Sequence, residues 1–197
     1  SNTSDTTREN LQNTQSHQKG GLSGKPIELK SSELIRFLSG SDVERFKKVL
    51  EIGSYEGIFS CFAAENFATV VHTIDPFDTS DQGTTVTNDV ESNFNHNVSV
   101  CPAGEKIISH KKLSDEFFET NKEIFDFIYV DGSHESDAAC RDLDNSLSFC
   151  RKSGIIWVDD YGSNYKDLHE SIDKWLDDHQ DDISVFHKGY QVGFIKL

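Results

Sequence analysis

Short apolar runs alternate along the chain with longer stretches in which apolar residues recur at helical spacing. The runs are bounded by polar or turn residues and predict strands, at residues 48–52, 69–74, 106–110, 125–131 and 154–158. The stretches between and after them predict helices, at residues 57–66, 135–150 and 168–175. Strands that alternate with helices are typical of an α/β fold with a mostly parallel sheet.

Further elements are expected at the two ends of this pattern and within it. Residues 26–40 predict a helix, because four apolar side chains share one face: Leu29, Leu34, Ile35 and Leu38. Two strands at residues 183–187 and 191–196 form a hairpin at the C-terminal end. The segment 76–102 is long and polar, with a helix expected at residues 86–95. Insertions of this kind commonly carry substrate specificity.

The domain organisation follows from composition. Residues 1–25 are rich in Ser, Thr, Asn, Gln and Gly and cannot offset their ordering entropy by burying apolar surface. We expect a disordered N-terminal arm there, either a plain tail or a lid that orders over bound ligand. The remaining residues, 26–197, are of ordinary size for one domain.

Net charge limits the classes of possible partner, and cysteine usage indicates the redox compartment. The formal net charge of −15 disfavours tight binding to a nucleic-acid backbone and favours a small-molecule substrate. The apolar runs are too short to span a membrane, and the N-terminus has no hydrophobic signal region. The cysteines lack CxxC spacing and are expected to be free thiols, mostly in the core: Cys61, Cys101, Cys140 and Cys150. A soluble protein in the reducing cytoplasm is the expectation.

The loop after the first predicted strand holds the most informative motif. Glu51 lies near the end of the strand, and Gly53 and Gly57 follow just before a helix begins. Glycines at this place let the backbone approach a ligand, and an acidic side chain can accept its hydrogen bonds, so the pattern predicts a nucleotide-cofactor loop. An ordinary strand-to-helix connection is the alternative. The GxGxxG fingerprint of a dinucleotide site is missing.

The ExGxxxG pattern of Glu51, Gly53 and Gly57 resembles motif I of class I S-adenosylmethionine-dependent methyltransferases. The resemblance implies a Rossmann-like, doubly wound, mostly parallel seven-stranded sheet whose last strand is antiparallel. It also implies that Glu51 and the loop hold the amino-acid end of the cofactor, the loop positions being Gly53, Ser54, Tyr55 and Gly57.

Two further places are assigned to this cofactor. Asp75 lies 18 residues after Gly57, close to the spacing at which an acid at the tip of the second strand meets ribose hydroxyls, and Pro76 follows it. An Asp in this position could instead cap a turn, as Asp-Pro often does. By resemblance to the family, side chains just beyond the third strand contact the adenine, which nominates His110 and Lys111.

Three acids follow two later strands. Asp131 comes after the fourth strand, and Asp159 and Asp160 come after the fifth. The carboxyl ends of the strands in a doubly wound sheet share one rim, so these carboxylates can converge. Clustered carboxylates repel one another, and a hard divalent cation such as Mg²⁺ relieves this. The alternative is that one or two of them cap the following helices.

A narrower resemblance covers the same residues. The strings YVDGSH (residues 129–134) and GIIWVDDY (residues 154–161) look like the methyltransferase 24 group, with its macrocin-type sugar O-methyltransferases and catechol O-methyltransferase-like relatives. It implies that Asp131, Asp159 and Asp160 hold Mg²⁺ or another divalent cation. Asp131 is also assigned to the catalytic and cofactor-binding residues.

His134 departs from the catechol-type pattern, in which the residue three positions after the first Asp is a basic lysine. An imidazole can accept a hydroxyl proton near neutral pH, so His134 is a candidate general base. The alternative is a residue at a helix start that hydrogen-bonds locally.

These residues together predict an enzyme. We expect an S-adenosylmethionine-dependent, divalent-cation-assisted O-methyltransferase that acts on a hydroxyl of a sugar or small metabolite. An NAD-dependent oxidoreductase and a non-catalytic nucleotide-binding module on the same fold are the alternatives. The acceptor and the oligomeric state are left open, a homodimer included.

Overall fold

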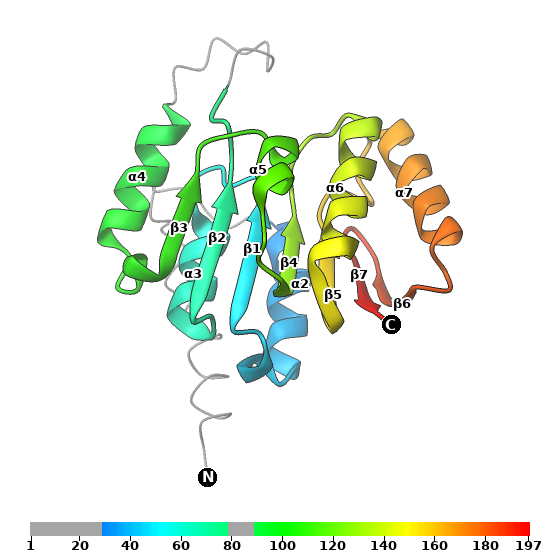
Figure 1. Ribbon diagram of the computed structural model, residues 1–197, viewed down its shortest axis with the longest axis horizontal. Coiled ribbons are helices and arrows are strands. Elements are labelled where there is room, and N and C mark those ends of the chain that lie inside the picture. Colours follow the sequence, from blue (N-terminus) through cyan, green and yellow to red (C-terminus); the bar gives the residue numbers. More distant parts are fainter. Residues whose placement is uncertain (1–28, 79–88) are drawn as a thin grey trace.

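A seven-stranded sheet organises the computed structural model, which describes residues 29–78 and 89–197. The strand order is β3-β2-β1-β4-β5-β7-β6 (Figure 1). The bounds are β1 Lys48–Ile52, β2 Val70–Ile74, β3 Ile107–His110, β4 Phe125–Val130, β5 Cys150–Val158, β6 Ile183–Lys188 and β7 Val192–Lys196.

The strand directions confirm the Rossmann-like prediction. Strands β1 to β5 pair in parallel, and β7 is antiparallel to both of its neighbours, β5 and β6. Among the seven strands, β7 alone therefore runs opposite to the rest. The order reverses beside β1, so the carboxyl ends of β1 and β4 flank the switch point, where ligands bind in open α/β sheets.

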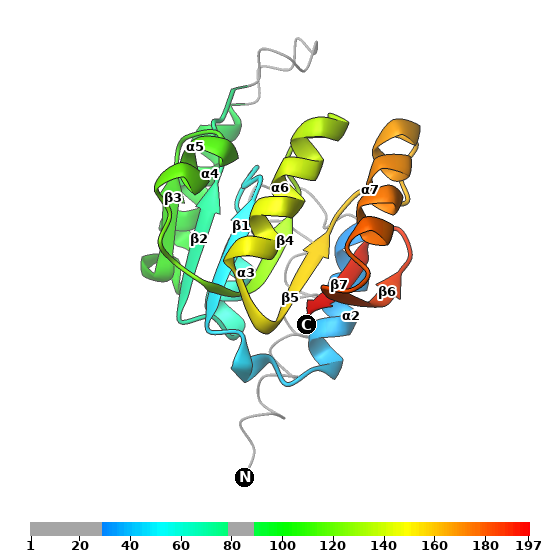
Figure 2. The ribbon, with the colours of Figure 1, turned by 45° about the vertical axis from the view of Figure 1, so that its right-hand side comes forward.

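Helices cover both faces of the sheet (Figures 1 and 2). One face carries α5, α6 and α7, and the other carries α2 and α3, with α4 packed against α3. Their bounds are α2 Leu29–Gly40, α3 Ile58–Asn66, α4 Val90–Val100, α5 Ser114–Thr120, α6 Ser136–Phe149 and α7 Lys166–Asp178, with short 3₁₀ turns at Val43–Arg45 and Gly104–Lys106.

Side-chain alternation along the central strands builds two cores. Leu50 and Ile52 of β1 pack on the α6 side, whereas Val49 faces the α3 side. Neighbouring side chains of a strand point to opposite faces, so Glu51 also points toward α3. This buries an ionisable group beneath the predicted cofactor loop.

The helix expected at residues 86–95 is displaced. It begins at Val90 and runs to Val100, because Asp89 caps it by accepting a hydrogen bond from the Ser92 N–H at 2.9 Å. It extends past residue 95 because Phe94 and Asn97 are buried. Residues 86–88 lie outside the described part of the chain, as does the expected N-terminal arm.

The cysteines are free, as predicted. Cys61, Cys101 and Cys150 are buried and Cys140 is partly buried. Burial raises the pKa of the Cys150 thiol to about 12, so this group is held as an unreactive thiol.

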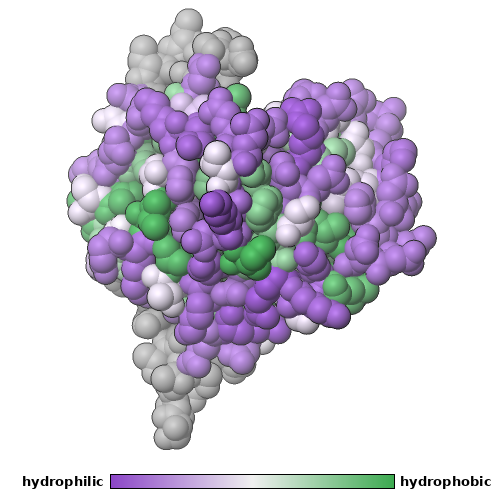
Figure 3. All heavy atoms as spheres, in the orientation of Figure 1, coloured by the Kyte–Doolittle hydropathy of each residue, from purple (hydrophilic) through white to green (hydrophobic). Residues whose placement is uncertain are grey.

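On the face shown in Figure 3, hydrophilic residues predominate and hydrophobic ones form small groups. None of the helices in residues 29–78 and 89–197 combines the length and the apolar character that crossing a bilayer requires.

Candidate functional site

The loop after β1 touches the loop after β4. Gly53 has φ +90°, and a Cβ atom placed on it would lie 1.9 Å from the carbonyl oxygen of Asp131. The Asp131 N–H donates to the Ile52 carbonyl at 2.8 Å, which fixes the two loops side by side. Gly53 is therefore required both for its backbone conformation and for this close approach.

The same loop turns sharply into α3. The Gly57 N–H donates to the Ser54 carbonyl at 2.8 Å, Tyr55 has φ +45°, and Gly57 has φ +79° at the helix N-cap. A Cβ atom on Gly57 would meet the Phe94 ring at 2.9 Å. Ser54 is buried and Tyr55 is half exposed.

Glu51 lies beneath this loop and is only 2% exposed. Its Oε1 accepts hydrogen bonds from Ser60 Oγ at 2.7 Å and Thr73 Oγ1 at 2.8 Å. Burial raises the pKa of Glu51 to about 8, and the two hydroxyl donors only partly counter it. Glu51 thus joins β1, β2 and α3 under the loop. Its predicted contact with a cofactor remains a prediction.

Asp75 performs the turn-capping role that was the alternative for it. Its Oδ1 accepts from the Phe77 N–H at 2.8 Å across Pro76. Its Oδ2 accepts from the Tyr55 N–H at 3.0 Å and so ties the end of β2 to the glycine loop. The structure places Asp75 at the side of the glycine loop, and its ribose contact remains a prediction.

The residues proposed near adenine lie at the sheet edge formed by β3. His110 is partly buried and stacks on His72 with ring centroids 5.2 Å apart, and its Nε2 lies 2.9 Å from His72 Nδ1. Burial lowers the pKa of His110. Lys111 is exposed and pairs with Glu91 of α4 at 2.7 Å. Their adenine contacts stay predictions.

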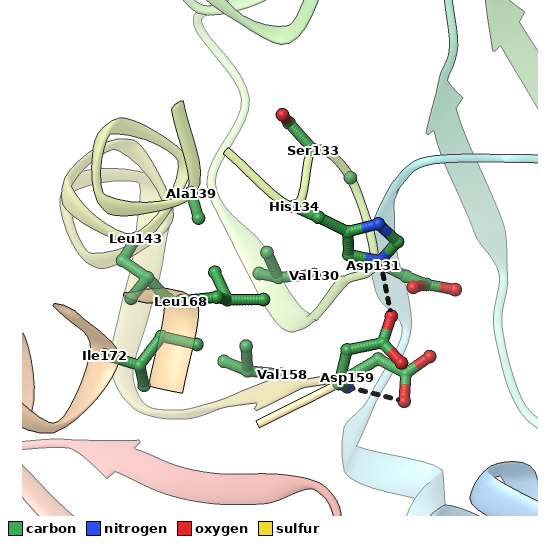
Figure 4. Close-up of a pocket in the computed structure, with 12 residues that line it drawn as sticks. Val130, Asp131, Ser133, His134, Ala139, Leu143, Val158, Asp159, Leu168 and Ile172 are labelled. Atoms are coloured by element: carbon green, nitrogen blue, oxygen red, sulfur yellow. Dashed lines mark hydrogen bonds and ion pairs between the residues drawn. The ribbon is translucent and has the colours of Figure 1, made fainter. Parts of the chain in front are cut away.

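Two of the three predicted acids meet at the carboxyl ends of β4 and β5. Ligand atoms of Asp131, His134 and Asp160 all lie within 4.8 Å of one another. Figure 4 shows His134 beside Asp131 at this place. His134 Nε2 is 2.7 Å from Asp160 Oδ2. Asp160 is buried and has φ +61°, an uncommon conformation for a residue other than glycine that clusters at functional sites.

Asp159 is not among these three residues, and its expected part in a metal site stays a prediction. Its Oδ1 accepts from the Asp160 N–H at 2.8 Å and from Gln191 Nε2 at 2.9 Å. Adjacent residues of an extended chain project in different directions, and the Asp159 side chain points toward Gln191 in the turn before β7. Asp159 and Asp160 nevertheless line one small pocket together with Asp131 and His134. Apolar side chains of α6 and α7 line the other side of this pocket.

Comparison with known proteins decides the family. A model described as a methyltransferase domain, that of the methyltransferase 24 family, matches residues 50–161, more than half of the chain. The chain belongs to this family. It is a class I S-adenosylmethionine-dependent methyltransferase. The match includes the glycine loop and all of the acids described above. It does not favour the oxidoreductase alternative.

Solved structures share the fold of this methyltransferase. The O-methyltransferase TomG from Streptomyces achromogenes, in complex with SAM, is 13% identical with a TM-score of 0.65, and the match covers 96% of this chain and 90% of that one. The O-methyltransferase from Bacillus cereus, in complex with SAH, is 13% identical with a TM-score of 0.63, covering 97% and 91%.

An rRNA methylase from Streptococcus thermophilus is also similar, at 11% identity and a TM-score of 0.63, covering 87% of this chain and 98% of that one. Likeness at such identities shows the fold alone. No curated protein matches this sequence.

Three residues of the methyltransferase site were missed from the sequence. Tyr165 stacks on His134 with ring centroids 4.3 Å apart, the Tyr190 hydroxyl donates to Asp160 Oδ1 at 2.8 Å, and Gln191 contacts Asp159. The pairing of Val158 with Val192 puts residues 190 and 191 beside the two acids. Predicting that register would have revealed Tyr190 and Gln191.

Proposed function

We propose that this methyltransferase transfers a methyl group from S-adenosylmethionine to a hydroxyl oxygen of a sugar or small metabolite, assisted by a divalent cation. The observation that carries the proposal is the meeting of Asp131, His134 and Asp160 directly beside the glycine loop. The close approach of Gly53 to Asp131 supports a single site shared by the glycine loop and the ionisable groups.

The residues present fit both bound groups. Asp131 and Asp160 offer the carboxylate oxygens that Mg²⁺ prefers, within the span that one ion's ligands occupy. The loop of Gly53, Ser54, Tyr55 and Gly57 would hold the amino-acid end of the cofactor through its backbone, and Asp75, bonded to the Tyr55 N–H at the side of the loop, would hold the ribose. When bound, S-adenosylmethionine supplies an electrophilic methyl group and the cation makes a hydroxyl more acidic.

His134 is suited to take the acceptor's proton. Its Nε2 must carry hydrogen to donate to the Asp160 carboxylate, which leaves the Nδ1 lone pair as the proton acceptor. Stacking on Tyr165 restrains the ring, and the side chain is 43% exposed, so an acceptor hydroxyl can reach it. This arrangement favours a base over the alternative of a local helix-start hydrogen bond.

The acceptor class rests on charge. A net charge of −15 and a rim lined by carboxylates repel a phosphate backbone, so we propose a small, hydroxyl-bearing acceptor and no nucleic-acid substrate. The described free thiols agree with action in the reducing cytoplasm.

A methyl-transfer screen tests this function. Sugar, catechol and carboxylate acceptors are incubated with labelled S-adenosylmethionine, with Mg²⁺ or with a chelator, and NAD binding is titrated in parallel. We expect label on a hydroxyl acceptor, with less transfer in the chelator. Binding of NAD without binding of S-adenosylmethionine would overturn the proposal.

A further inference from the structure

The turn between β6 and β7 contacts both adjacent acids of the site. Tyr190 donates its hydroxyl hydrogen to Asp160 Oδ1 at 2.8 Å, and Gln191 donates from Nε2 to Asp159 Oδ1 at 2.9 Å. The Gly162 N–H donates to the Tyr190 carbonyl at 2.8 Å, which ties the chain after Asp160 to the same turn. The acids at the end of β5 are thus held from the turn between β6 and β7.

The orientation of the Gln191 amide is determined by its surroundings. Gln191 is fully buried, and its Oε1 accepts from Trp157 Nε1 at 2.7 Å. An indole N–H can only donate, so the amide oxygen must face Trp157 and the NH₂ group must face Asp159. The side chain therefore presents a donor, and not merely volume, to the carboxylate.

A third residue, Glu33 of α2, holds the turn itself. Its Oε1 accepts from the Tyr190 N–H at 3.1 Å, and its Oε2 accepts from the Gln191 N–H at 3.0 Å and lies 2.8 Å from His187 Nε2. A Cβ atom on Gly189 would lie 3.0 Å from the Glu33 carboxylate, so the turn is wrapped closely around it. Burial alone would raise the pKa of Glu33, but these donors outweigh it and leave the pKa below its usual value.

We propose that Tyr190 and Gln191 are positioning residues that orient the carboxylates of Asp160 and Asp159, and that Glu33 holds both in place from α2. Tyr190 and Gln191 lie more than 150 positions from Glu33 in the sequence. The resemblance to the family assigned no role to any of the three residues. The effect on turnover rests on the proposed function, whereas the orientation of the carboxylates does not.

Buried polar networks are sensitive to single changes, because a partner left without its hydrogen bond bears the full cost of desolvation. Partners of this kind around a metal or catalytic group are worth on the order of tenfold or more in affinity or activity. A residue that only filled space would not produce such an effect when replaced by an isostere.

The test uses three isosteric variants of the full chain. Tyr190→Phe removes the hydroxyl from Asp160, Gln191→Glu replaces the donor that faces Asp159 with a repelling carboxylate oxygen, and Glu33→Gln turns an acceptor into a donor. Tyr161→Phe is the matched control, because its hydroxyl bonds Asp173 at 2.5 Å, away from the acids. Glu123→Gln is the control for Glu33, since Glu123 pairs with Lys48 on the surface.

Crystal structures of the wild type and the variants give the first readout. We expect the Asp159 or Asp160 carboxylate to change rotamer in the three variants and to stay in place in the two controls. Carboxylates that keep their wild-type positions in all three variants would overturn the proposal, whatever the activity. If the carboxylates move in the variants but the wild type methylates no acceptor, the positioning role is supported and only the proposed function is contradicted.

Kinetics give the second readout. In the variants kcat should fall on the order of tenfold while SAH affinity, measured by calorimetry, is unchanged, and the controls should match the wild type. Displaced carboxylates with an unchanged kcat would show that the network is merely structural and would contradict the role in turnover.

Discussion

Asp160 and His134 are 26 residues apart in the sequence, yet Asp160 Oδ2 lies 2.7 Å from His134 Nε2. The contact joins the chain after β4 to the chain after β5 and sets which ring nitrogen of His134 carries hydrogen. A carboxylate that orients an imidazole is a common arrangement for general bases.

Replacement of His134 tests its role as base. His134→Ala should lower kcat by about 10²-fold or more, because general-base catalysis contributes on that order, while S-adenosylmethionine affinity stays unchanged. Steady-state kinetics and calorimetry make the two measurements. The control is His96→Ala, an exposed histidine on α4. Full activity in the His134 variant would reassign the base.

A divalent cation should stabilise the protein through Asp131 and Asp160. Saturating Mg²⁺, at about 100 times its Kd, should raise the free energy of unfolding by about 2.7 kcal/mol. Thermal unfolding with and without Mg²⁺ measures it. Asp160→Asn should abolish the response, and Asp178→Asn, in a surface pair with Lys174, should retain it. The same response in both variants would remove the cation from this site.

The pH dependence of stability should report Glu51. Its pKa is raised to about 8 in the folded protein, against about 4.5 when unfolded, so the folded state binds the extra proton between these values. The stability that Glu51 contributes is therefore fully present below pH 4.5 and is lost as pH rises toward 8, by up to about a few kcal/mol.

Glu51→Gln imitates the shape of the protonated, neutral side chain and should reduce the loss of stability as pH rises. Urea unfolding at a series of pH values from about 4 to about 9, which covers both ends of this range, makes the comparison. An equally steep loss in the variant would mean that Glu51 does not cause it.

Gly53 should tolerate no side chain. Gly53→Ala places a Cβ atom 1.9 Å from the Asp131 carbonyl oxygen at φ +90°, so we expect a loss of at least about 2 kcal/mol. Gly40→Ala is the matched control, because nothing lies within 4 Å of its added Cβ. Equal melting temperatures for the two variants would show that the two loops do not meet as described.

Local patterns were sufficient to predict most of the fold. Buried parallel strands read as short apolar runs, and the loop glycines marked the end of β1, so the sheet and its switch point were accessible from the sequence. The start of α4 was not, because Thr, Asn and Asp recur through that segment and several could serve as caps.

Only those parts of the site that the ends of parallel strands bring together could be predicted from the sequence. Asp131 and Asp160 share a rim because their strands are parallel, which the sequence indicates. The direction of the Asp159 side chain depends on Gln191, which lies in the turn just before β7. Contacts of that kind depend on the register of an antiparallel strand late in the chain, and no local pattern specifies them.

The most direct measurement is the fate of a methyl group labelled with carbon-13 on S-adenosylmethionine, followed by NMR in the presence of hydroxyl-bearing acceptors and Mg²⁺. The account predicts a new signal from a methyl group bound to oxygen, strongly reduced in His134→Ala. Label that appears on nitrogen or carbon, or transfer that is unaffected by loss of His134, would contradict it.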